Sequence, residues 1–147
     1  MNIELTKEQY KELLLLVLLG SWVRGGVADM RGEYGKEMDE LEEYLLREAK
    51  KFNCSDLAEY FEGHIVPSDR LAKEYEKIIE EYNDDEFWSQ LSTRLGQRDF
   101  EKTISKEEKQ HMKDNNGRFP ERIHTLYEEY DKEFEKHGID RLEIKEN

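Results

Sequence analysis

The longest apolar run of the chain lies near its start, where every residue from Leu13 to Leu19 is apolar. Thr6 and Gln9 precede it with the spacing of a capping box, in which the threonine side chain accepts an amide hydrogen and the glutamine reaches back. Gly25-Gly26 follows, and glycine readily adopts the backbone angles of a helix end. The pattern predicts a helix over residues 7–24 that is apolar all round and therefore buried at the centre of the fold.

Apolar residues at helical spacing, together with turn and capping residues, predict the remaining helices. We expect a helix over residues 36–52, a short one carrying Leu57, Tyr60 and Phe61, one capped by Ser68 and broken at Asn83-Asp84, one over residues 84–100, one opened by the capping box of Ser105, and one from Pro120 to Gly138. The helix opened by Ser105 has almost no apolar face, so we expect it to be exposed or poorly ordered.

Polar and apolar residues alternate at both ends of the chain, over residues 2–5 and 139–144. Two lone strands are each unstable in water, so we expect them to pair with each other. The predicted fold is therefore mainly α, with six to seven helices packed around a buried N-terminal helix and a small two-stranded β-ribbon formed by the terminal strands. A length of 147 residues fits a single helical domain over residues 1–147.

The overall charge excludes several classes of function. The formal net charge is −13 with 40% charged residues, and this opposes direct binding to nucleic acid or to anionic membranes. The apolar run is too short and interrupted to span a bilayer, and its acidic start is unlike a signal peptide. The single Cys54 cannot form an intrachain disulfide and is expected to be buried. We infer a cytoplasmic protein.

Negative charge is concentrated between Glu74 and Glu86, where seven acidic residues accompany the single Lys77. Because opposite potentials steer encounter, this stretch is a candidate contact surface for a basic protein. A solvated helix edge has the same pattern. Phe87 and Trp88 follow, and since they cannot point the same way, one of them is expected to be partly exposed, as interface anchors are. The candidate partner-binding residues are Glu80, Glu81, Asp84, Asp85, Glu86 and Trp88.

A second group of residues has the pattern of a small-ligand site. Arg94 and Arg98 lie four residues apart, hence on one helix face, where paired guanidinium groups clamp a carboxylate or phosphate or else bridge to acidic residues of a neighbouring helix. The glycine-rich stretch 25–35 is a flexible connector or a binding loop that holds Arg31 and Tyr34. It lacks the residues of a phosphate-binding loop.

Metal binding and covalent catalysis find little support in the sequence. Glu-x-x-His occurs at Glu108/His111 and Glu121/His124, a spacing used in helical two-metal sites. Glutamate is so abundant here that chance explains both pairs, and the first lacks the apolar surround that such a site needs. Because no nucleophile elbow is present, we assign no catalytic residue, metal or cofactor.

Three stretches of the chain resemble a family of short acidic bacterial proteins of uncharacterised function. They are Ile3-Glu4-Leu5-Thr6 running into the leucines, Asp85-Glu86-Phe87-Trp88 running to Phe100, and residues 130–144 with Gly138-Ile139-Asp140-Arg141-Leu142. The resemblance implies a shared fold and transfers no catalytic residue. The glycine-rich stretch after Trp22 departs from the family's pattern.

These patterns favour a non-enzymatic cytoplasmic binding module that contacts a basic protein through its acidic helical surface. An inhibitor or immunity role against a cationic toxin or nucleic-acid enzyme would fit such a surface. The alternative is a small-ligand binder or enzyme with a pocket near residues 25–35 and Arg94/Arg98. The protein is expected to be a monomer or a weak homodimer.

Overall fold

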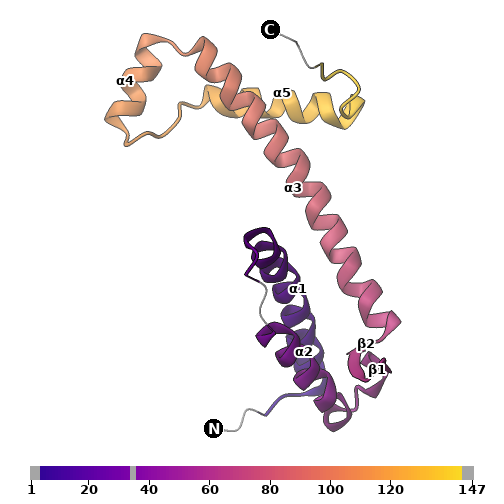
Figure 1. Ribbon diagram of the computed structural model, residues 1–147. Helices are drawn as coiled ribbons and strands as arrows, with labels where there is room; N and C mark the ends of the chain where they lie inside the picture. Colours follow the sequence, from indigo (N-terminus) through magenta and orange to yellow (C-terminus); the bar gives the residue numbers. More distant parts are fainter. Residues whose placement is uncertain (1–3, 34–35, 144–147) are drawn as a thin grey trace. The chain divides into compact units, whose positions relative to one another are not determined.

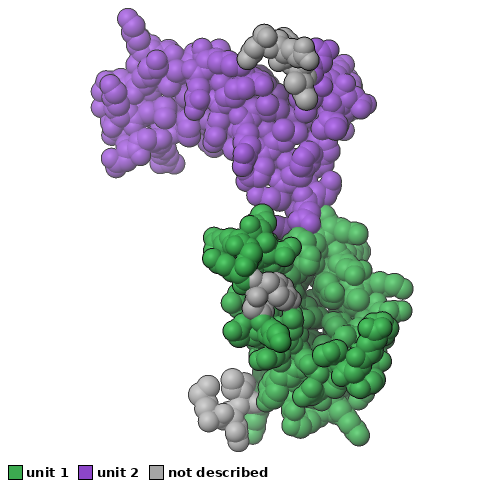
Figure 2. Space-filling view, in the orientation of Figure 1, with its two compact units in different colours: residues 1–81 green, residues 82–147 purple. Residues whose placement is uncertain are grey.

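The computed structural model describes residues 4–33 and 36–143 (Figure 1). In chain order the elements are α1 (Lys7–Arg31), α2 (Glu37–Glu48), the 3-10 turns η1 (Ala49–Phe52) and η2 (Ser55–Leu57), β1 (Ala58–Phe61), β2 (His64–Pro67), α3 (Asp69–Thr103), α4 (Lys106–Asp114) and α5 (Arg122–His137). They form two compact units, unit 1 over residues 1–81 and unit 2 over residues 82–147 (Figure 2). The single domain over residues 1–147 stays a prediction.

The core of unit 1 forms where α1 packs along α2. Tyr10, Leu14 and Leu18 are spaced by four residues, so they fall on one face of α1 and are buried. They meet Leu46 of α2 and Ala49 of η1 in one apolar cluster. Cys54 is buried in the same cluster, as expected from the sequence.

Tyr10 ties the start of α1 to the end of α2. Its ring stacks on Phe52 with centroids 4.3 Å apart and planes 8° from parallel. Its hydroxyl donates a hydrogen bond of 2.6 Å to the carbonyl oxygen of Leu45. Burial raises the pKa of Tyr10 to about 12, because a charged phenolate loses its hydration inside the cluster.

α1 differs from its prediction in length and in burial. It passes through Gly25-Gly26 and ends at Arg31, where Gly32 adopts the left-handed conformation (φ 66°). A glycine inside a helix costs only about 1 kcal/mol, so the pair weakens α1 without ending it. Burial on all sides was wrong as well, since Leu16, Val23 and Met30 are 58%, 54% and 82% exposed.

The apolar composition of α1 has one further consequence. Within the described part of the chain, α1 is the one helix whose length and composition are compatible with crossing a membrane, and 11% of its apolar window is buried.

The capping box predicted at the start of α1 is confirmed, with Thr6 accepting from the Gln9 amide at 3.2 Å and the Gln9 side chain accepting from the Thr6 amide at 2.9 Å.

The sheet of this protein is a hairpin in the middle of the chain. β1 and β2 pair antiparallel from Ala58↔Pro67 to Phe61↔His64. Glu62 and Gly63 connect them with positive φ angles of 47° and 95°, as a tight hairpin turn requires. The short helix predicted through Tyr60 and Phe61 was therefore wrong.

The predicted ribbon of terminal strands was also wrong. Residues 4–6 form no strand, and residues 139–143 form a turn and irregular backbone. Residues 2, 3 and 144 of the predicted strands lie outside the described residues.

α3 is one continuous helix across the break predicted at Asn83-Asp84. Asparagine and aspartate lower helix propensity by well under 1 kcal/mol each, and no proline or glycine accompanies them there. With this merger and the hairpin, the described chain has five α-helices instead of the predicted six to seven.

In unit 2 the second half of α3 packs against α5. Ser92, Gly96 and Phe100 recur every four residues on the buried face of α3. A Cβ atom on Gly96 would lie 2.5 Å from Cδ1 of Tyr127, so only glycine permits this close approach of the two helices. The helix predicted from Pro120 to Gly138 is confirmed as α5, which also buries Ile123.

Candidate protein-binding surface

The predicted contact residues all lie on α3. Glu80 and Glu81 belong to unit 1, and Asp84, Asp85 and Glu86 to unit 2. The first four are exposed and Glu86 is half-buried. We call residues 74–86 the acidic segment.

The carboxylates of the acidic segment are poorly balanced by cations. Lys77 Nζ lies 3.6 Å from Glu81 Oε1. Glu86 accepts a hydrogen bond of 2.8 Å from the Gln90 amide. Within residues 4–33 and 36–143, no hydrogen bond or ion pair engages the side chains of Glu80 and Asp85.

Five carboxylates elsewhere in the chain are held by arginines. The pairs are Glu43–Arg47, Asp56–Arg70, Asp99–Arg98, Glu108–Arg122 and Glu133–Arg141. Arginine binds carboxylate through a planar fork of donors, which neutralises it locally. These five carboxylates are therefore neutralised locally, whereas Glu80 and Asp85 have no such partner among the described residues.

The helical spacing of the acidic segment also places like charges together. Glu76 and Glu80, Glu80 and Asp84, and Glu81 and Asp85 are each four residues apart on α3. Each such like-charge pair costs a helix about 0.2–0.5 kcal/mol. The segment is thus less stable as a helix than a sequence of mixed charges would be.

The two aromatic residues after the segment have different surroundings. Trp88 is half-buried, its ring lies 5.6 Å from that of Phe134, and its indole N–H donates a hydrogen bond of 3.2 Å to Asp84. Phe87 is 51% exposed and meets Trp88 edge-on at 4.9 Å. Trp88 is thus a packing residue of unit 2, and Phe87 is the exposed aromatic beside the acidic segment.

Sequence reasoning missed a second acidic surface, in unit 1. A groove of about 620 Å³ lies between α2 and β2. Four carboxylates line it together with Lys36, His64 and apolar residues of β2, and they belong to Asp39, Glu40, Glu42 and Glu43. We call it the acidic groove. The available signal was the run of acidic residues in the first half of α2.

Glu42 and Glu43 of the acidic groove have opposite environments. Burial raises the pKa of Glu42, against a hydrogen bond from Ser21, and the charge of Asp39 raises it further. Arg47 holds the pKa of Glu43 below its usual value, helped by the backbone N–H of Ile65. Glu42 is therefore a carboxylate that loses hydration without gaining a cation.

Glu42 of the acidic groove and Glu76 of the acidic segment, both in unit 1, influence the same tyrosine. Burial raises the pKa of Tyr75, and the charges of Glu76 and Glu42 raise it further. Glu42 of α2 and Glu76 of α3 thus act on the same hydroxyl group.

The two arginines of the predicted clamp, Arg94 and Arg98, have different surroundings. Arg98 donates to both oxygens of Asp99, at 2.8 and 3.0 Å, and to the Tyr130 hydroxyl at 2.9 Å. These bonds raise the pKa of Arg98 and hold that of Asp99 well below its usual range. Arg94 is exposed, and no ion pair engages it within the described residues.

The predicted binding loop is largely helix. Arg31 lies exposed in the last turn of α1 and lines a pocket of about 370 Å³ in unit 1 with Arg24, Glu33 and Glu37. Tyr34 lies outside the described residues. Because Arg31 and the pair Arg94/Arg98 belong to different units, a pocket that joins them stays a prediction.

The carboxylate of one Glu-x-x-His pair has a structural partner. Glu108 closes the capping box of Ser105 and accepts from Arg122 Nε at 2.6 Å. Arg122 also lies over the Phe100 ring, 4.7 Å from its centroid. Among the residues the structure describes, no three His, Cys, Asp or Glu side chains converge as metal ligands.

Comparison with known proteins adds no function to this geometry. Neither a family model, nor a curated protein, nor a solved structure matches the chain. The resemblance to short acidic bacterial proteins stays a prediction.

Proposed function

We propose that this protein is a non-enzymatic binding module that contacts a basic protein through the acidic segment of α3. The residues that make the contact are Glu80, Glu81, Asp84, Asp85 and Glu86, with the exposed Phe87 and the half-buried Trp88 at one end. Blocking a cationic enzyme, as an inhibitor or immunity protein does, is one role that such a surface serves.

The observation that carries this proposal is the concentration of like charge on α3, where seven carboxylates accompany the single Lys77 between Glu74 and Glu86. Five arginines hold carboxylates elsewhere, whereas Glu80 and Asp85 have no cation within the described residues. Cations of a partner would relieve the repulsion between like charges along α3 and would be steered toward it over long range. Without a partner, the same like-charge pairs only destabilise the helix.

The acidic groove gives the partner a second point of attachment. Glu42 is half-buried without a cation, so a lysine or arginine side chain that enters the groove would restore its favourable charge environment. His64 and the Glu43–Arg47 pair border the same groove. We therefore expect a partner with basic residues spread over its surface.

Charge reversal tests the surface. The variant carries Glu80→Lys, Glu81→Lys, Asp84→Lys and Asp85→Lys, and its control carries Glu129→Lys, Asp131→Lys, Glu135→Lys and Asp140→Lys, four exposed residues of unit 2 outside the acidic segment. Both variants change the net charge equally. Tagged proteins are used to capture basic proteins from an extract of the source cells, and each captured protein is then purified and titrated against all three chains.

The expected result is that the first variant loses a partner which the wild type and the control both bind. Binding by the wild type should also weaken steeply with salt, because exposed charges are screened. Equal partner binding by both variants would refute the surface.

A further inference from the structure

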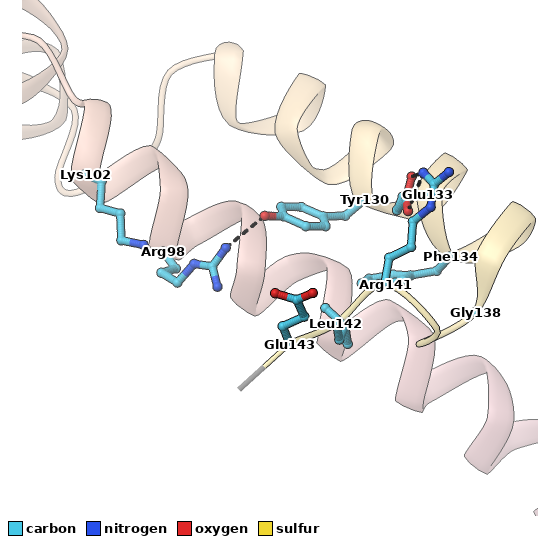
Figure 3. A pocket seen from close by; sticks show the side chains of 9 residues that line it. All are labelled: Arg98, Lys102, Tyr130, Glu133, Phe134, Gly138, Arg141, Leu142 and Glu143. Carbon is cyan, nitrogen blue, oxygen red and sulfur yellow. Dashed lines mark hydrogen bonds and ion pairs between the residues drawn. The ribbon is translucent and has the colours of Figure 1, made fainter. Parts of the chain in front are cut away.

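A second site lies wholly within unit 2 and does not depend on the acidic segment. A pocket of about 620 Å³ opens between the second half of α3, the end of α5 and the residues that follow α5 (Figure 3). Arg98 and Lys102 of α3 line one side, and Arg141 and Glu143 line the other. Tyr130, Phe134 and Leu142 supply apolar surface between them.

The cations of this pocket retain unused hydrogen-bond donors. Arg98 engages Asp99 and Tyr130 through Nε and Nη2 only, which leaves the two N–H groups of Nη1. Arg141 engages Glu133 through Nη1 only, at 3.2 and 3.3 Å. Lys102 Nζ lies 3.6 Å from Asp99 Oδ1, beyond hydrogen-bond distance. Each cation is oriented by an acid and still has donors to offer.

A carboxylate without a partner faces these donors. Figure 3 shows the Glu143 side chain directed into the pocket on the side toward the Arg98 guanidinium. No hydrogen bond or ion pair engages Glu143 within the described residues. The pocket therefore presents free positive donors and a free negative acceptor together.

Cationic donors and a free carboxylate in one pocket favour a ligand that carries both charges. A simple anion would be attracted by Arg98 and Lys102 but repelled by Glu143, and a simple cation would meet the reverse. A ligand that carries both charges on neighbouring atoms satisfies both sides. The rings of Tyr130 and Phe134 and the side chain of Leu142 then favour an apolar group on the same ligand.

We infer that this pocket binds a free α-amino acid with an apolar side chain. Its carboxylate accepts from Arg98 Nη1 and Lys102, its ammonium donates to Glu143, and its side chain packs on Phe134 and Leu142. This inference goes beyond the proposed protein partner, because it concerns other residues and another class of ligand.

Calorimetric titration of the full chain tests the inference. The probes are L-leucine and L-phenylalanine, each compared with its N-acetyl derivative, which lacks the ammonium, and with its amide, which lacks the carboxylate. Loss of one charge-assisted hydrogen bond should weaken binding about tenfold or more. We expect the free amino acid to bind and both derivatives to bind at least about tenfold more weakly.

Two variants that leave the packing intact complete the test. Glu143→Gln removes a carboxylate that makes no bond in the structure, and Glu135→Gln removes an exposed carboxylate of α5 outside the pocket. Glu143→Gln should weaken binding of the free amino acid about tenfold and should not weaken binding of its N-acetyl derivative, whereas Glu135→Gln should change neither. Absence of wild-type binding to both amino acids, equal binding of the N-acetyl derivative, or equal effects of the two variants would each overturn the site.

Discussion

Replacing Glu80 by lysine should make the protein more stable and at the same time a poorer binder of its basic partner. Glu80 is exposed on α3, with Glu76 four residues before it and Asp84 four residues after it. No cation engages it within the described residues. Glu80→Lys converts both like-charge pairs into opposite-charge pairs, and it converts the pair with Lys77, three residues before it, into a like-charge pair. The apolar core is not touched.

The magnitude follows from three helix neighbours, Glu76, Lys77 and Asp84. A like-charge pair at this spacing costs about 0.2–0.5 kcal/mol and an opposite-charge pair contributes a similar amount, so each converted pair changes stability by about 0.4–1 kcal/mol. The pair with Glu76 has the better orientation, with the acid toward the helix start, and the pair with Asp84 the poorer one. Two converted pairs gain stability and the pair with Lys77 loses it, so we expect a net gain of about 0.5 kcal/mol. This corresponds to about 1–2 °C in the unfolding midpoint for a chain of this size.

Glu74→Lys is the matched control on the same helix. Glu74 lies four residues after Arg70 and three before Lys77, so a lysine there places three cations on one face. Both variants change the net charge by the same amount. If the effect came only from the overall charge of −13, both would stabilise the protein; local pairing instead predicts opposite signs.

Thermal unfolding followed by circular dichroism at low and high salt measures the effect. Glu80→Lys should raise the midpoint, Glu74→Lys should lower it, and both shifts should shrink in high salt because exposed charges are screened. Shifts of the same sign, or shifts that persist in high salt, would show that repulsion along α3 is not the cause. In parallel, Glu80→Lys should weaken capture of the basic partner even though its helix is more stable.

Two further predictions concern packing and pH. Gly96→Ala should lower the free energy of unfolding by about 1 kcal/mol, because the clash with Tyr127 outweighs the better helix propensity of alanine. Gly20→Ala is the control, and because Gly20 has open space around it, this substitution should raise the free energy of unfolding by about 1 kcal/mol. Equal effects of the two substitutions in chemical denaturation would contradict this packing. Arg122 lowers the pKa of Glu108 from 4.5 to about 2, so the stability from this pair is present above pH 4.5 and is lost as the pH falls toward 2. Hydrogen exchange of α4 should show that loss in the wild type and not in Glu108→Gln.

The parts of the fold that could be predicted from the sequence are set by residues close together in the chain. The capping box of Thr6 and Gln9 and that of Ser105 and Glu108 each close over three residues, so local chemistry decides them. The end of α5 at Gly138 has the same origin. Such features depend little on what packs against them.

The errors arose where two local patterns were equally consistent with the sequence. Leu57, Tyr60 and Phe61 have the spacing of a helix face, yet they lead into a hairpin whose turn is Glu62-Gly63. The positive φ at both turn residues and the pairing with β2 decided between the patterns. Asn83-Asp84 resembled a helix break, but a modest loss of propensity does not end a helix that continues in both directions.

The candidate surfaces are harder to predict, because pairing between charges is a tertiary property. Glu80 and Glu108 look alike in the sequence, but one has no cation within the described residues and the other is held by Arg122 through two bonds. The acidic groove likewise requires α2 and β2 to meet, and the environment of Glu42 depends on that meeting.

One sequence feature does anticipate which carboxylates stay available. No arginine occurs between Arg70 and Arg94, so the acidic segment has only lysines beside it. A lysine ammonium is a strongly hydrated point charge and lacks the planar fork with which arginine binds both oxygens of a carboxylate. Carboxylates in such a stretch keep their hydrogen-bonding capacity for another molecule. A partner that presents arginines would form with Asp85 and its neighbours the kind of bond that Arg122 forms with Glu108 inside the chain.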